Sequence, residues 1–152
     1  MTGFGRLATI VLLTLAATPA QAQEQTVANA QAFLQEVLHS GSGAALLIGV
    51  EQFANIESAS GSGCSGSIAG RRDDGVVIVR TIDWHSVGSV GAYSVTGYSA
   101  NWAGVLVAGG VTGYGVADAR LDIKAPAGLR DRLLNAFTFL KNACDSSKRY
   151  GF

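Results

Sequence analysis

The sequence has little charge and few of the residues that mark a metal or redox centre. Charged residues make up 14% of the chain, against a usual share near 25%, and acidic and basic residues balance at 11 each. With this balance the chain lacks the excess of positive charge that binding to nucleic acid or anionic lipid requires. Two histidines and two cysteines are too few for a zinc cluster, and no ladder of acidic residues for calcium occurs. We therefore expect no metal, no cofactor and no nucleic-acid partner.

The chain also lacks an apolar run long enough to span a bilayer, which takes roughly 20 residues. The run nearest the N-terminus covers only residues 7–17. It follows the basic Arg6 and precedes Ala20-Gln21-Ala22, as in a secretory signal peptide. Residues 1–22 are therefore predicted to be removed, leaving residues 23–152 as one exported domain, periplasmic or secreted, with no membrane insertion. Its sparsely charged surface favours a protein partner or a homo-oligomer.

The two cysteines, Cys64 and Cys144, lie far apart in a chain that we expect to reach an oxidising compartment. This spacing favours one structural disulfide over a C-x-x-C redox motif. In the chain-entropy model a loop of that size contributes on the order of 4 to 5 kcal/mol.

Amphipathic helices are predicted near both ends of this domain. Thr26 is suited to the N-cap of a helix that extends to about His39, and Ser40-Gly41 ends it. The second helix extends from about Pro126 to Cys144, with proline in its first turn. Apolar residues recur at helical spacing in both: Val27, Ala30, Phe33, Leu34, Val37 and Leu38 in the first, and Leu129, Leu133, Ala136, Phe137, Leu140 and Cys144 in the second.

Between the helices, short β-branched and alternating runs predict strands. The segments are AALLIGV, GVVIVRTIDW, AYSVTGYS, NWAGVLVAGGV and ARLDIK. Residues 58–69 fit either a loop or the first arm of a hairpin that turns at Asp74-Gly75. Because no helix separates the strands, we expect an α+β fold. Its sheet is an antiparallel meander of five or six strands, with both helices packed on one face.

An acid and a histidine stand two positions apart at the end of one predicted strand. On a continuous strand Asp83 and His85 would share a face, and an aspartate that orients a histidine is half of a hydrolase triad. No serine lies in a nucleophile-elbow context to complete it. The alternative, which we favour, is that Asp83 ends the strand with a side-chain-to-backbone bond while Trp84 enters the core.

The string GSGCSG at residues 61–66 formally matches a dinucleotide-binding fingerprint. That fingerprint requires an apolar strand before it and a helix after it, and neither is expected here. We therefore attribute the match to chance.

Four aromatic residues fall in the glycine-rich strands, where neighbouring side chains are small. Core packing accounts for them, but an exposed patch of such residues is the best candidate for a binding site. The four candidates are Tyr93, Tyr98, Trp102 and Tyr114.

A leading helix, the element IDW..V..V, a closing helix LRDRLLNAFTFLKNACD and a short tail ending GF together resemble small exported bacterial proteins of unknown function. The resemblance implies a similar fold and brings no activity, cofactor or catalytic residue with it. Together these features favour a non-enzymatic binding or envelope-associated structural protein. The alternative is a small exported hydrolase that uses Asp83 and His85 with an unidentified serine.

Overall fold

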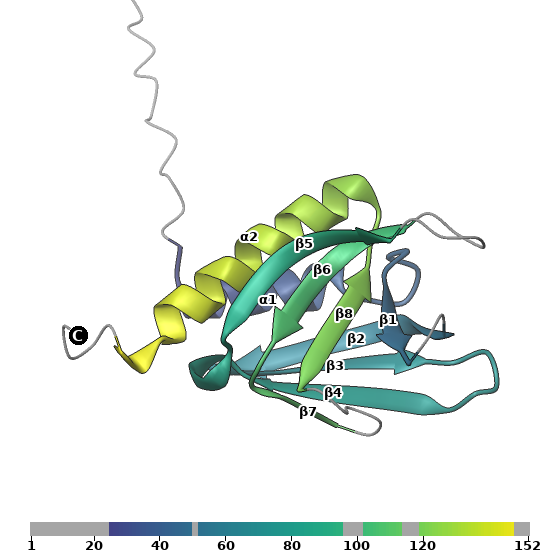
Figure 1. Ribbon diagram of the computed structural model, residues 1–152, viewed down its shortest axis with the longest axis horizontal. Coiled ribbons are helices and arrows are strands. Elements are labelled where there is room, and N and C mark those ends of the chain that lie inside the picture. The colour runs from purple at the N-terminus through teal and green to yellow at the C-terminus, as the bar shows by residue number, and fades with distance from the viewer. Residues whose placement is uncertain (1–24, 50–51, 96–101, 114–118, 148–152) are drawn as a thin grey trace, which may run out of the picture.

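The computed structural model describes residues 25–49, 52–95, 102–113 and 119–147, so the predicted signal segment lies outside the described part. Within these ranges the order of elements is one helix, eight strands and a second helix (Figure 1). A short 3-10 turn, η1, follows the fourth strand. The elements are α1 (Val27–Val37), β1 (Ala45–Ile48), β2 (Gln52–Ser62), β3 (Ser65–Arg71), β4 (Val77–Asp83), η1 (Trp84–Ser86), β5 (Ser89–Val95), β6 (Trp102–Ala108), β7 (Val111–Gly113), β8 (Arg120–Lys124) and α2 (Ala127–Cys144).

The strands form one antiparallel sheet, in the order β5-β6-β8-β1-β2-β3-β4-β7. The α+β class is confirmed, whereas the predicted count of five or six strands is wrong. The simple meander is also wrong. β1 to β4 are successive neighbours, but β8 lies between β6 and β1, with Ala45 opposite Lys124. The first and last of the described strands therefore pair in the middle of the sheet.

Two of the additional strands arise from the segment rich in glycine and serine. β2 and β3 form a long hairpin that turns at Gly63-Cys64, where Gly63 has φ +52°. Residues 58–69 are therefore almost wholly strand, because pairing with neighbours on both sides overrides their weak β propensity. The predicted turn at Asp74-Gly75 joins β3 to β4. Gly75 there has φ +87°, and Asp74 accepts a hydrogen bond from the N–H of Val76 at 3.1 Å.

A further strand arises because one predicted strand is interrupted at two consecutive glycines. The predicted run of residues 101–111 divides at Gly109-Gly110 into β6 and β7, and both glycines have positive φ. A Cβ on Gly110 would collide with the carbonyl oxygen of Asp83, whose own N–H donates to the Gly110 carbonyl at 2.7 Å. After the bend the chain pairs with β4 at the opposite edge of the sheet.

Both predicted helices are present, side by side on one face of the sheet (Figure 1). Thr26 caps α1, its hydroxyl accepting from the N–H of Asn29 at 3.1 Å. The core between helices and sheet consists mainly of aliphatic side chains with two large rings, Trp84 and Phe137, whose centroids lie 5.4 Å apart. The predicted disulfide is confirmed: Cys64 and Cys144 join the β2–β3 turn to the last residue of α2.

Candidate functional site

Asp83 and His85 stabilise the turn that follows β4. The Asp83 carboxylate accepts from the backbone N–H of His85 at 3.1 Å and from the Ser86 hydroxyl at 2.7 Å. Nδ1 of His85 lies 2.6 Å from the carbonyl oxygen of Cys144, so the ring contacts the end of α2. The chain leaves the strand at Trp84, which is 1% exposed. The side-chain hydrogen bonds identified for Asp83 and His85 within the described residues thus connect a turn and a helix end, and none joins the carboxylate to the imidazole.

The glycines of the GSGCSG string provide space for two large side chains. A Cβ on Gly61 would collide with the amide of Gln31, and a Cβ on Gly66 would lie 3.3 Å from Nε1 of Trp84. Gln31 of α1 is 3% exposed, and its Nε2 donates to the carbonyls of Gly63 and Ser65 at 3.2 and 3.1 Å. These glycines therefore allow α1 and η1 to pack closely on the hairpin that carries the disulfide.

Two of the four candidate aromatic residues meet on the face of the sheet that is turned away from the helices, which we call the outer face. The rings of Tyr93 and Trp102 are 5.1 Å apart in an edge-to-face arrangement. Phe53 meets the other side of Trp102 at 5.3 Å. We name Phe53, Tyr93 and Trp102 the outer-face aromatic cluster. Tyr98 and Tyr114 lie outside the described residues.

Strand pairing brings this cluster together. Tyr93 on β5 is opposite Gly104 on β6. A Cβ on Gly104 would collide with the carbonyl of Ile123 on β8, and the Tyr93 ring lies 3.2 Å from the same point. Because opposite residues of antiparallel strands share a face, the ring can lie over this glycine. Sequence reasoning missed Phe53 because β2 was not expected there, although Phe53 alternates with the buried Ala54 and Ile56.

Charged groups border the cluster. The ammonium of Lys124 lies 5.0 Å from the centroid of the Phe53 ring, within range of a cation–π contact. Arg120 holds the largely buried Asp122 through two hydrogen bonds of 2.7 and 2.9 Å. Burial raises the pKa of Tyr93 well above its ordinary value, and the negative charge of Asp122 adds to the effect. The cluster therefore presents neutral rings with a cation at one side.

A polar hollow of about 430 Å³ adjoins the cluster at Phe53, between β2 and the β3–β4 loop. The ion pair of Arg72 and Asp74, at 2.7 Å, lies on its wall. The full lining consists of Gln52, Phe53, Asn55, Arg72, Asp73 and Asp74. This hollow extends the surface near the cluster with amides and charges of both signs.

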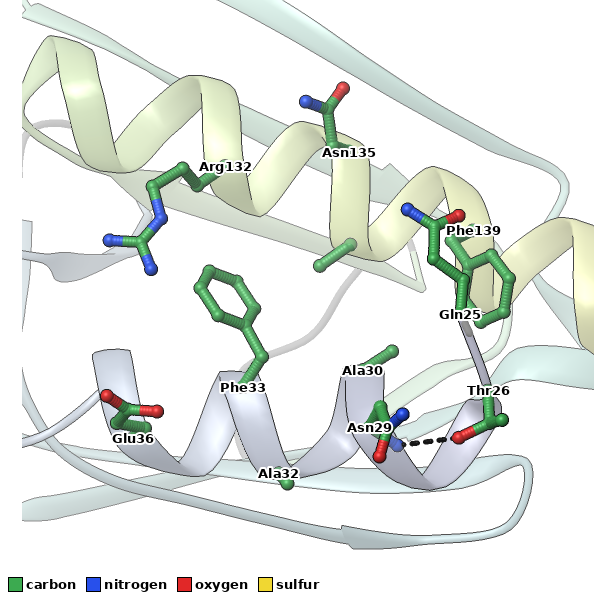
Figure 2. Close-up of a pocket in the computed structure, with 11 residues that line it drawn as sticks. Gln25, Thr26, Asn29, Ala30, Ala32, Phe33, Glu36, Arg132, Asn135 and Phe139 are labelled. Atoms are coloured by element: carbon green, nitrogen blue, oxygen red, sulfur yellow. Dashed lines mark hydrogen bonds between the residues drawn. The ribbon is translucent and has the colours of Figure 1, made fainter. Parts of the chain in front are cut away.

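A second hollow, of about 550 Å³, lies between α1 and α2 (Figure 2). Its centre is the ring of Phe33 with the guanidinium of Arg132 at 4.8 Å. Ala30 and Phe139 extend the apolar part, and Glu36 lies at one end. Phe33 of α1 and Arg132 of α2 make contact across this hollow, so we regard it as part of the packing between the helices.

Within the described residues no group of three or more histidine, cysteine or acidic side chains is placed to hold a metal ion. Neither described helix has the length and hydropathy that crossing a membrane requires. Comparison of the chain with protein-family models, with curated proteins and with solved structures found no match.

Proposed function

We propose that this chain is an exported, non-enzymatic binding domain that contacts a protein partner through the outer-face aromatic cluster. The observation that carries the proposal is the position of the three rings. Phe53, Tyr93 and Trp102 are partly exposed, and none belongs to the hydrophobic core or to the partly buried residues packed against it. Aromatic side chains that lie on a sheet surface and do not pack into the core are typical of the centres of protein interfaces.

The surroundings of the cluster suit a protein partner. A sheet face is broad and shallow, and the polar hollow beside Phe53 supplies hydrogen-bonding and charged groups at its border. An apolar centre with a polar rim is the usual anatomy of a protein interface. The low charge of the whole chain also favours contact between large, weakly charged surfaces.

Export is supported by two features. Residues 1–22 have the charge, apolar run and small-residue pattern of a signal peptide. The disulfide between Cys64 and Cys144 is of the kind that persists in oxidising compartments. The hydrogen bonds of Asp83 and His85 favour a structural role for that turn, and therefore binding over the hydrolase alternative.

Two matched variants test the proposal. Trp102→Ala removes the central ring, whereas Val79→Ala truncates an apolar side chain that is 44% exposed on β4. Both would be expressed with the signal segment and cross-linked in intact cells, and the adducts would be identified by mass spectrometry. We expect a discrete adduct that Trp102→Ala loses and Val79→Ala keeps. Identical adduct patterns in the wild type and both variants would contradict a role for the cluster.

A further inference from the structure

The polar hollow beside Phe53 contains hydrogen-bonding groups that the fold itself does not use. Gln52 and Asn55 of β2 and Asp73 of the β3–β4 loop line it, and all three residues are exposed. Within the described ranges, no hydrogen bond or ion pair is formed by the side chain of any of the three. Each amide both donates and accepts hydrogen bonds, and the carboxylate accepts them. The hollow therefore has donors and acceptors available for a ligand.

The charges of the hollow favour a neutral ligand. Its lining carries one guanidinium and two carboxylates, and the guanidinium of Arg72 is already bonded to Asp74 at 2.7 Å. Arg71, the neighbouring cation, bonds Glu57 instead, at 2.6 and 3.1 Å. An anion would therefore meet carboxylates without a cation to pair with. A cation would meet the single exposed carboxylate of Asp73, and ion pairs at exposed sites contribute little to binding.

Phe53 adds an apolar wall to this polar lining. Its ring is held by Trp102, whose centroid lies 5.3 Å away in an edge-to-face arrangement, and by the ammonium of Lys124 at 5.0 Å. A ring that is already held in place loses little conformational freedom when a ligand packs against it. The hollow thus combines one apolar surface with neutral donors and acceptors, and it suits a ligand that has both kinds of surface.

We propose that this hollow binds a neutral sugar. Sugar hydroxyls both donate and accept hydrogen bonds, so they match the amides of Gln52 and Asn55 and the carboxylate of Asp73, while the C–H face of the sugar ring packs against Phe53. The volume of about 430 Å³ is within the range of small-ligand sites, roughly 300–1,000 Å³. The proposal goes beyond the protein contact of the aromatic cluster and does not depend on it, because the three polar residues lie outside the cluster.

Sugars that share one ring and differ in charge test this site. Glucose, galactose and mannose, each with its amino and its uronic acid counterpart, would be titrated past the millimolar range into the isotope-labelled mature protein with its disulfide intact. The side-chain amide resonances of Gln52 and Asn55 report binding directly. We expect at least one neutral sugar to shift them along a saturable curve. That sugar should bind more tightly than its amino counterpart, and at least ~10-fold more tightly than its uronic acid, because like charges repel.

Variants then assign the binding to the hollow. Asn55→Ala should weaken the neutral sugar ~10-fold, because it removes a group that donates and accepts. Asn135→Ala, which truncates an exposed asparagine on α2, should leave its Kd unchanged. Asp73→Asn should raise the affinity for the uronic acid relative to the neutral sugar ~5-fold, since it removes the opposing charge. The dispersion of the backbone resonances verifies that each variant is folded.

Three results would overturn the proposal. The first is that none of the neutral sugars shifts the amide resonances of Gln52 and Asn55. The second is that an amino sugar binds most tightly, which would make the hollow a cation site. The third is that Asn55→Ala and Asn135→Ala bind the neutral sugar equally well while both are folded. None of these results bears on the cross-linked adduct that Trp102→Ala should lose, so the two proposals can fail separately.

Discussion

Gln31 fastens α1 to the hairpin that carries the disulfide, and its replacement by methionine measures how strongly. Methionine keeps the volume of the side chain but removes the two hydrogen bonds to the carbonyls of Gly63 and Ser65. At about 1 kcal/mol net for each bond, Gln31→Met should lower the free energy of unfolding by about 2 kcal/mol. Little of this loss should come from a cavity, because the change conserves volume.

The same helix provides a matched control one turn later. Gln35 is exposed and donates a single hydrogen bond, at 3.3 Å, to the carbonyl of Gly61. Because water can replace that bond, Gln35→Met should change the free energy of unfolding by less than about 0.5 kcal/mol.

Urea unfolding followed by far-UV circular dichroism distinguishes the two variants. With a slope near 2 kcal/mol/M, the Gln31 variant should unfold at a midpoint roughly 1 M lower. The slope itself should not change, since the fold is retained. Equal losses from Gln31→Met and Gln35→Met would refute the reasoning, because water would then satisfy the two carbonyls of the hairpin as readily as Gln31 does.

Three further predictions concern the disulfide, one glycine and one phenol. The Cys64–Cys144 bond closes a separation of 80 positions, so replacing both cysteines by alanine should cost about 4.5 kcal/mol in the chain-entropy model, measured by urea unfolding. Gly104→Ala should destabilise the folded state by about 1 to 3 kcal/mol, because the new Cβ meets strand backbone. Gly128→Ala, in open space on α2, should stabilise the folded state by up to about 1 kcal/mol. Equal effects of the two substitutions on thermal unfolding would contradict the packing argument. The raised pKa of Tyr93 means that the folded state holds this proton more tightly than the unfolded state. Its contribution is therefore complete below the unfolded value of about pH 10 and is lost as the pH rises further. Tyr93→Phe should accordingly flatten the alkaline fall of the unfolding free energy and remove a component at high pH from the ultraviolet tyrosine titration.

The features that the sequence predicted correctly depend on local patterns. Both helices follow from apolar periodicity, with Thr26 before the first and Pro126 before the second. The disulfide follows from two cysteines in a chain with a signal-like N-terminus. None of these inferences requires knowledge of which strands are neighbours.

The features that sequence analysis missed depend on partners distant in the chain. The strands of residues 52–71 have little apolar content, and they form because β1 and β4 flank them. Gly61 and Gly66 leave space for the side chains of Gln31 and Trp84. This role can be recognised only once the structure shows that those two side chains lie over the glycines. Likewise Phe53 joins the aromatic cluster through a strand order that no local pattern reveals.

The pairing of β1 with β8 in the middle of the sheet determines the order in which the chain can fold. β1 ends at Ile48, and β8 does not begin until Arg120. One side of β1 therefore stays unpaired until most of the polypeptide has been made. Pairing between such distant strands is slow, because a long loop must close first. In that interval the apolar edge of β1 is open to other chains, and pairing with β8 closes it.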